Sequence, residues 1–232
     1  MKKTLNEIAS ESSFIFKTNW SRRKGLVVPT SDTVQLGNDA VEIEAAVLYV
    51  DLASSTDLVI GHKDYFAAEI IKSFLLASCN VIRNNCGEIV SFDGDRVMAV
   101  FIGDKKCSNA AKTGLQITSA IREVDKSLKN FYTKTSYVID YGIGIDVSDL
   151  FVIRTGIRGA NDLSWVGVAA NIAAKLSELR GRREKVFITD KVYDRMANSS
   201  KYGGKDNECM WTDLRLNIRG NKIYGSDWYW NF

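Results

Sequence analysis

Residues 88–102, EIVSFDGDRVMAVFI, consist of two apolar runs on either side of an Asp-Gly-Asp tripeptide. Both runs are short and rich in β-branched and aromatic residues, and a glycine between two such runs predicts a β-hairpin. The bend explains Gly94, but it does not explain why Asp93, Asp95 and Arg96 crowd into the same turn. The segments on either side of this hairpin therefore decide both the fold and what the charges do.

Strand and helix patterns alternate around the hairpin. Residues 43–52 have the length and β-branched content of a buried strand, and residues 62–85 carry apolar residues at helical spacing, with Gly87 capping their end. Residues 109–128 have a second amphipathic helical pattern, and residues 136–147 are a further strand. The order β-α-β-β-α-β predicts a ferredoxin-like α+β unit, an antiparallel central sheet with helices on one face.

Further elements follow this unit, and a polar segment precedes it. They are a strand at 149–156, a small-residue helix at 167–180, a strand and short helix at 184–196, and a final hairpin at 216–232. Residues 1–40 are polar and mixed in character. We therefore predict an N-terminal arm at 1–40 and one larger domain at 41–232.

The composition narrows the class of protein. With 232 residues, 45% hydrophobic and 25% charged, the chain can bury a real core, and a net charge of +3 does not by itself indicate nucleic-acid binding. Four cysteines without CxxC spacing and a single histidine argue against a zinc site and favour free thiols. The N-terminus lacks the apolar core of a signal peptide, and no stretch approaches the roughly 18 apolar residues of a membrane span. We expect a cytoplasmic protein without a membrane or nucleic-acid partner.

Two carboxylates lie where the predicted sheet brings strand ends together. Asp51 ends an apolar strand, and Asp95 lies in the hairpin between the next two. Two close, buried carboxylates raise each other's pKa, and a divalent cation removes that cost. Hard oxygen ligands select Mg²⁺ or Mn²⁺. The alternative is that each acid caps a turn and faces water.

Small and hydroxyl residues follow Asp51 directly. Ser54, Ser55 and Thr56 lie between a strand and a helix, where backbone N–H groups can approach a phosphate. The alternative is a plain helix N-cap, which is common for Ser and Thr. A metal beside an anion cradle indicates a nucleoside triphosphate.

Three segments together resemble the motifs of class III nucleotidyl cyclases. VLYVDLASSTDLV (47–59), GEIVSFDGDRVMAVF (87–101) and LSWVGVAANIAAKL (163–176) occur in the family's order. The resemblance implies that Asp51, Asp95 and the backbone carbonyl of Leu52 bind two Mg²⁺ or Mn²⁺ ions. It also implies that the ribose 3′-oxygen attacks the α-phosphorus and releases pyrophosphate.

The same resemblance implies an assembly and further site residues. The active site would lie between the subunits of a head-to-tail homodimer, with 41–232 as the cyclase catalytic domain. Asn171 would orient the ribose, facing the partner's aspartates. Lys175 stands where the family has an arginine, and it would place one positive charge on the α-phosphate without a bidentate fork.

The base-reading positions depart from the family's purine patterns. Ser91 stands where adenylate cyclases have lysine, and Ser164 where the partner residue is Asp or Thr. Tyr49 lies two residues before Asp51 and so projects to the same face, where it would narrow the base pocket. Arg96 would donate to the base or ribose. The alternatives are a core aromatic for Tyr49 and a salt bridge to Asp93 for Arg96. We therefore expect a pyrimidine substrate.

A narrower resemblance supports this expectation. YVDLASST (49–56), DGDRVMAVFIGD (93–104) and RTGIRGANDLSWVG (154–167) resemble the bacterial pyrimidine cyclases of the Pycsar anti-phage system. That resemblance implies that CTP or UTP becomes a cyclic nucleotide, which activates a separate effector. Arg154 and Arg158 would reach the triphosphate or order their loop, or else lie in a surface turn.

Several alternatives remain open. CTP is favoured over UTP on overall resemblance only, because Ser91 and Ser164 can each donate or accept a hydrogen bond. UTP as the sole substrate and a catalytically silent nucleotide-binding homologue are the alternatives. A diguanylate cyclase or polymerase palm would leave the third motif without a role. The short basic clusters at 22–24 and 180–185 are interpreted as solvated turns.

Overall fold

The computed structural model describes residues 3–231 and contains two compact units. The ribbon unit comprises Met1–Glu44 and Asp149–Gly167, and the sheet unit comprises Ala45–Ser148 and Val168–Phe232. Two long strands, β2 and β5, contribute residues to both units. The predicted functional division at residue 40 stays a prediction.

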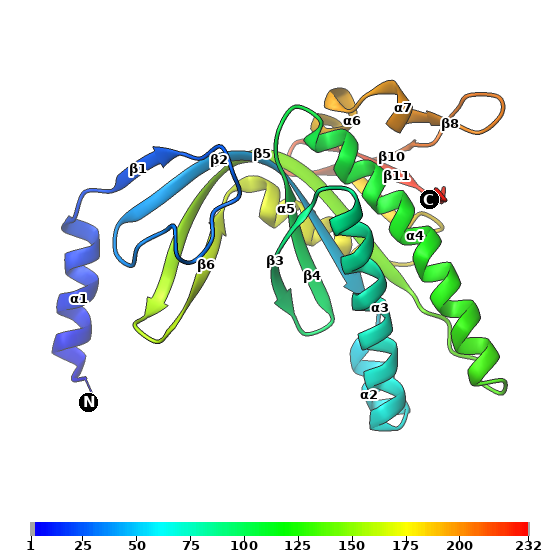
Figure 1. Cartoon of the computed structure of the whole chain (residues 1–232), viewed down its shortest axis with the longest axis horizontal. Coiled ribbons are helices and arrows are strands. Elements are labelled where there is room, and N and C mark those ends of the chain that lie inside the picture. The colour runs from blue at the N-terminus through cyan, green and yellow to red at the C-terminus, as the bar shows by residue number, and fades with distance from the viewer. Residues whose placement is uncertain (1–2, 232) are drawn as a thin grey trace. The chain divides into compact units, whose positions relative to one another are not determined.

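The elements follow one another along the chain as labelled in Figure 1. In order they are α1 (Leu5–Lys17), β1 (Ser21–Lys24), β2 (Asp39–Leu52), α2 (Ser55–Gly61), α3 (Asp64–Asn84), β3 (Glu88–Asp93), β4 (Arg96–Phe101), α4 (Lys106–Phe131), β5 (Tyr141–Ile157), β6 (Ala160–Val166), α5 (Val168–Ser177), β7 (Val186–Thr189), α6 (Asp190–Arg195), α7 (Asn198–Lys201), β8 (Tyr202–Gly203), β9 (Glu208–Cys209), β10 (Thr212–Ile218) and β11 (Asn221–Ser226). The predicted β3–β4 hairpin, the two long helices and the final β10–β11 hairpin are all present.

The central sheet of the sheet unit has the strand order β10-β11-β7-β5-β2-β4-β3. The pairs β2–β4 and β3–β4 are antiparallel, as expected, but β5 and β7 are parallel. The sheet is therefore mixed, and the prediction of a purely antiparallel sheet is wrong. A parallel pair needs a long crossover connection, and here the crossover carries β6 and α5.

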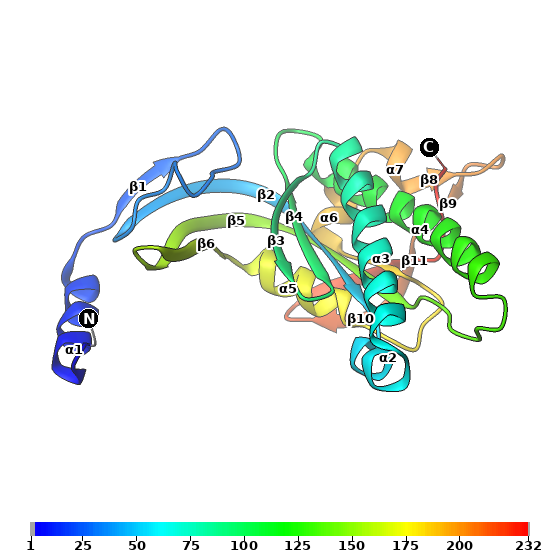
Figure 2. The same cartoon turned by 60° about the horizontal axis from the view of Figure 1, so that its bottom comes forward.

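Helices α3 and α4 pack side by side on one face of this sheet (Figure 2). Their buried residues, among them Phe74 and Leu115, join Val50, Val97 and Ile143 in one apolar core. Within the described residues, α3 alone is long and apolar enough to cross a membrane by length and composition. Its buried apolar side chains, among them Phe74 and Ile82, belong to this core, as in a core helix of a globular domain.

Helix α5 packs on the other face of the sheet. A Cβ on Gly144 of β5 would lie 2.0 Å from the carbonyl oxygen of Ala173, and one on Gly142 would lie 2.3 Å from that of Ser177. Glycine at both positions therefore lets the helix backbone approach the strand. The predicted close packing of this small-residue helix is confirmed.

The ribbon unit contains two strand pairs. β1 runs parallel to the first part of β2, and β6 folds back antiparallel on the last part of β5. Val34, Val41, Leu150 and Val152 are buried within the unit. Helix α1 closes its N-terminus with a capping box between Thr4 and Glu7, and none of its described residues is buried.

Candidate active site

The β3–β4 hairpin and β2 arrange the predicted site in two rows across the sheet. In one row Asp93, Arg96 and Asp51 are cross-strand partners, and in another Ser91, Met98 and Tyr49 are partners. Residues two apart on a strand point to the same face. Asp51, Tyr49, Arg96 and Ser91 therefore project to one face, opposite the face that α3 and α4 cover.

Asp51 is almost fully buried, and two arginines hold its carboxylate. Its side chain is 10% exposed; Oδ1 accepts from Nε of Arg96 at 3.0 Å and Oδ2 from Nη2 of Arg180 at 2.7 Å. Arg96 also donates to Glu178 at 2.9 Å. The charge on Arg96 is thus shared between Asp51 and Glu178, rather than placed in the pair with Asp93 that was the alternative for this residue.

Asp95 has a different environment. Its Oδ2 is buried and accepts no hydrogen bond among the described residues. Gly94 beside it has φ of +60°, a left-handed conformation that favours glycine and makes the bend. A cavity of about 470 Å³ is lined by Ser55, Thr56, Gly94 and Asp95 together with three aliphatic side chains. The structure therefore brings the predicted phosphate cradle and the second aspartate to one cavity.

The first part of the cradle is a strained turn. Ser54 has φ of +53°, which is uncommon for a residue other than glycine, and its side chain makes no capping hydrogen bond. The Ser54 hydroxyl therefore does not cap helix α2, which was the alternative for this residue. Leu52 ends β2 with its side chain in the core, and the N–H of Ala53 donates to the carbonyl of Asp140 at 2.8 Å.

The residues at this site fit a divalent cation. Oδ2 of Asp95 is a hard ligand that accepts no hydrogen bond from the described residues, and Asp51 is a second carboxylate, on β2 opposite Arg96, the residue that follows Asp95. In the described part of the chain, no group of three or more His, Cys, Asp and Glu side chains gathers for a metal. Two carboxylates and a backbone carbonyl would leave positions for phosphate oxygens, which is how Mg²⁺ is usually bound.

Tyr49 and Arg96 interact with each other beside Asp51. The guanidinium carbon of Arg96 lies 5.9 Å from the centre of the Tyr49 ring, within the range of a cation–π contact. Burial raises the pKa of Tyr49, so its hydroxyl stays protonated and can donate. Burial lowers the pKa of Arg96, but its hydrogen bonds to Asp51 and Glu178 raise it by more. Arg96 is therefore a permanent cation in this site.

Helix α5 carries the third motif. Asn171 and Lys175 are four residues apart, so they lie on the same side of the helix, and both are exposed. Their position relative to β5 is fixed by the close contact at Gly142 and Gly144.

Three predicted substrate residues lie in the ribbon unit. The hydroxyls of Ser164 and Thr155 lie 2.8 Å apart, and Nε of Arg154 donates to Oδ1 of Asn161 at 2.6 Å. Arg158 lies exposed in the β5–β6 turn. Arg154 thus ties its own hairpin together, which is the loop-ordering role considered for it. Whether any of the three contacts substrate stays a prediction.

Sequence reasoning missed Arg180 and Glu178. The charge pattern predicts a solvated turn at 180–185, and this prediction is wrong for Arg180, which binds Asp51 across 129 residues of sequence. The available signal was a run of charges directly after the third motif, one turn beyond Lys175. The other basic cluster also forms ion pairs, from Arg22 to Glu42 and from Arg23 to Asp39.

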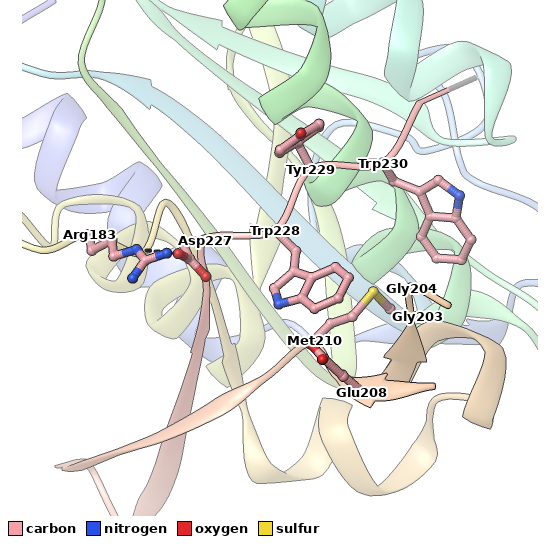
Figure 3. A pocket seen from close by; sticks show the side chains of 9 residues that line it. All are labelled: Arg183, Gly203, Gly204, Glu208, Met210, Asp227, Trp228, Tyr229 and Trp230. Carbon is pink, nitrogen blue, oxygen red and sulfur yellow. Dashed lines mark ion pairs between the residues drawn. The ribbon is translucent and has the colours of Figure 1, made fainter. Parts of the chain in front are cut away.

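A larger cavity, of about 670 Å³, lies elsewhere in the sheet unit (Figure 3). Trp228, Tyr229 and Trp230 of the C-terminal tail line it with Met210, and Arg183 forms an ion pair with Asp227 at its edge. It shares no residue with the cavity at Asp95. All four cysteines are free, as predicted.

The chain resembles characterised proteins over nearly its whole length. It is 40% identical over 228 residues to a uridylate cyclase of Xanthomonas perforans, covering 97% of each chain. It is 40% identical over 218 residues to one of Burkholderia cepacia, covering 93% of each. A third uridylate cyclase, from a Rhodovulum species, is 38% identical over 210 residues, covering 89% of this chain and 88% of that one. No family model matches the chain.

Solved structures share the fold. A bacterial light-regulated adenylyl cyclase matches with a TM-score of 0.68 and 19% identity, over 80% of this chain and 91% of that one. An adenylyl cyclase from P. aeruginosa matches with a TM-score of 0.65 and 18% identity, over 81% and 95%. The fold is the class III cyclase fold predicted from the three motifs. The chain therefore belongs to the bacterial pyrimidine cyclase family that includes these uridylate cyclases, a branch of the class III nucleotidyl cyclases.

Proposed function

We propose that this chain converts UTP to 3′,5′-cyclic UMP and pyrophosphate with two Mg²⁺ or Mn²⁺ ions per active site. The observation that carries the proposal is the orphaned oxygen of Asp95 at a cavity that Ser55 and Thr56 also line. It leaves a ligand position for a cation next to hydroxyls that can bind phosphate. The chain's similarity to three uridylate cyclases supports the choice of nucleotide.

The chain's own residues have distinct roles in this reaction. Asp51, Asp95 and the Leu52 carbonyl would hold the cations, which when bound neutralise the triphosphate and acidify the ribose 3′-hydroxyl. Asn171 orients the ribose, and Lys175 places a positive charge at the α-phosphate. The 3′-hydroxyl releases its proton to solvent and its oxygen bonds to the α-phosphorus, while the bond from that phosphorus to the bridging oxygen breaks and pyrophosphate leaves.

The base pocket supports a pyrimidine. Tyr49 projects to the same face as Asp51, and Ser91 lies in the same row as Tyr49 across β4. A serine there can accept from or donate to the 4-position of either pyrimidine, so it does not separate UTP from CTP. The overall resemblance favours CTP. We propose UTP instead, because the three relatives are named uridylate cyclases.

We propose the head-to-tail homodimer as the active form. Class III chemistry needs the metal aspartates and Asn171 in one site. In the assembly that we propose, one subunit supplies the aspartates and the other supplies Asn171 and Lys175. Ser164 of the ribbon unit would face Ser91 of the other subunit at the base.

The biological role that we propose is anti-phage signalling in the cytoplasm. The cyclic nucleotide would leave the enzyme and activate a separate effector that senses it. The motif resemblance to Pycsar cyclases supports this role, and its direct test is protection of cells that carry the gene and its effector against phage.

Incubation of the purified chain with each of the four nucleoside triphosphates and Mn²⁺ tests the activity. We expect cyclic UMP from UTP, with less or no product from CTP, and no product from the Asp51→Ala, Asp95→Ala double variant. Turnover of ATP or GTP alone would contradict the pyrimidine assignment. Nucleotide binding without turnover of any of the four would show a silent homologue.

A further inference from the structure

Arg180, like Arg96, contacts the predicted metal ligand Asp51 directly. Its Nη2 donates to Oδ2 of Asp51 at 2.7 Å, and its Nη1 donates to the carbonyls of Ser177 and Leu179. The Arg180 side chain is 31% exposed, so the guanidinium is held but remains accessible to solvent. The contact is therefore a specific ion pair at the edge of the site and not a solvated turn.

The fold leaves room for this guanidinium. A Cβ on Gly142 would lie 2.7 Å from Nη1 of Arg180. Glycine at this position of β5 lets the side chain lie against the strand and reach Asp51. Arg96 takes the other oxygen of the same carboxylate, so both Asp51 oxygens accept from guanidinium groups.

The four charges that these ion pairs join balance one another, and Asp95 lies outside the ion-paired set. Asp51 and Glu178 carry two negative charges, and Arg96 and Arg180 carry two positive ones, all linked by ion pairs. A divalent cation that replaced the arginines on Asp51 would face two guanidinium groups with no new anion to neutralise them. A cation that arrives with a triphosphate brings that anion, and guanidinium groups bind phosphate in a bidentate manner.

We propose that Arg180 is a further substrate-binding residue, which exchanges Asp51 for phosphate oxygens of the triphosphate when nucleotide and metal bind together. Before that exchange, Arg180 and Arg96 compete with the cation for Asp51. Metal alone therefore binds weakly, and triphosphate and metal strengthen each other's binding. This inference rests on the proposed metal site at Asp51 and Asp95.

Equilibrium dialysis against Mn²⁺ without nucleotide tests whether Arg180 competes with the cation for Asp51. We expect Arg180→Ala to bind Mn²⁺ on the order of tenfold more tightly than the unchanged chain, because one competing charge is gone. Arg180→Lys keeps the charge and should stay near the unchanged chain. Arg183→Ala is the matched control, since Arg183 lies in the same turn but pairs with Asp227 (Figure 3). If Arg180→Ala does not fold, Arg180→Gln carries the same expectation.

Equilibrium dialysis with added inorganic triphosphate tests whether Arg180 exchanges Asp51 for phosphate oxygens. This probe has no base, so the result does not depend on base recognition. At equal free Mn²⁺, it should increase Mn²⁺ binding in the unchanged chain and in Arg183→Ala, and increase it several-fold less in Arg180→Ala. Equal behaviour of Arg180→Ala and Arg183→Ala in both experiments would overturn the role of Arg180. Asp95→Asn separates the proposed metal site from the proposed exchange of Arg180. If it abolishes Mn²⁺ binding while Arg180→Ala has no effect, the metal site stands and the exchange is wrong. If it leaves binding unchanged, the proposed metal site is itself wrong.

Discussion

Gly144→Ala should separate α5 from the sheet and so reduce both stability and cyclase activity. The new Cβ would lie 2.0 Å from the carbonyl oxygen of Ala173, whereas ordinary contact begins at 3.4 Å. The helix must therefore retreat by about 1.4 Å, since the obstructing atom is backbone and cannot rotate away. Overpacking of this kind costs up to about 3 kcal/mol. For a chain of this length, that lowers Tm by roughly 6–12 °C.

The effect on activity follows from what α5 carries. Asn171 and Lys175 both lie on this helix. A displacement of about 1 Å at a catalytic group can cost on the order of 100-fold in rate. We expect kcat with UTP to fall by about that factor at a temperature where the variant is still folded. Thermal unfolding followed by circular dichroism and a cyclic UMP assay measure the two effects.

Gly61→Ala is the matched control for this prediction. Gly61 ends α2, and a Cβ there would meet nothing within 4 Å. We expect its stability to change by less than about 1 kcal/mol. A Gly144→Ala variant with the Tm and kcat of Gly61→Ala would refute the reasoning, because α5 would then not depend on close approach to β5.

Three further predictions concern single side chains. Asp95→Asn should lower kcat by at least about 100-fold with little change in the urea midpoint, because Oδ2 of Asp95 accepts no hydrogen bond from residues 3–231 that the substitution could break. Asp51→Asn should lower kcat and also lower the free energy of unfolding by about 1–3 kcal/mol, since it leaves two arginines opposite a neutral amide; an unchanged urea midpoint would contradict it. Burial raises the pKa of Asp146, whose Oδ2 is buried and accepts no hydrogen bond within the described part of the chain. The folded chain then binds this proton more tightly than the unfolded chain, so stability falls as pH rises from about 3.9 through the raised pKa. Asp146→Asn should remove that fall in urea curves taken from about pH 4 to pH 7, and curves that keep the unchanged slope would contradict the assignment.

The local elements of the fold could be predicted because their signals are local. The β3–β4 hairpin follows from two apolar runs around Asp-Gly-Asp, and the helices follow from their 3.6-residue periodicity. The parallel pairing of β5 with β7 could not be predicted in this way, because it depends on where the crossover through α5 returns. Gly87 was predicted as a helix cap, but the left-handed residue is Cys86, with φ of +61°. Gly87 instead leaves room for the ring of Phe101, 2.6 Å from its would-be Cβ.

The candidate site also has one part that could be predicted from local signals and one part that could not. The position of Asp51 and Asp95 at the ends of adjacent strands could be predicted, because both strands belong to one predicted unit, and Asp51 pairs with Arg96, the residue that follows Asp95. The ion pair between Asp51 and Arg180 could not, because 129 residues separate them and only the approach of α5 to β5 joins them. A charged run at a helix end has no periodicity that distinguishes a solvated turn from an active-site contact.

The double ion pair on Asp51 also affects how this enzyme can evolve. A residue used only in catalysis can be lost by a single substitution in a lineage that no longer needs the activity. Asp51 also neutralises Arg96 and Arg180 in the unliganded chain. Its loss therefore weakens the fold as well as the chemistry. An inactive descendant would need matching changes at both arginines to persist, so Asp51 is protected by selection for folding even where selection for activity is relaxed.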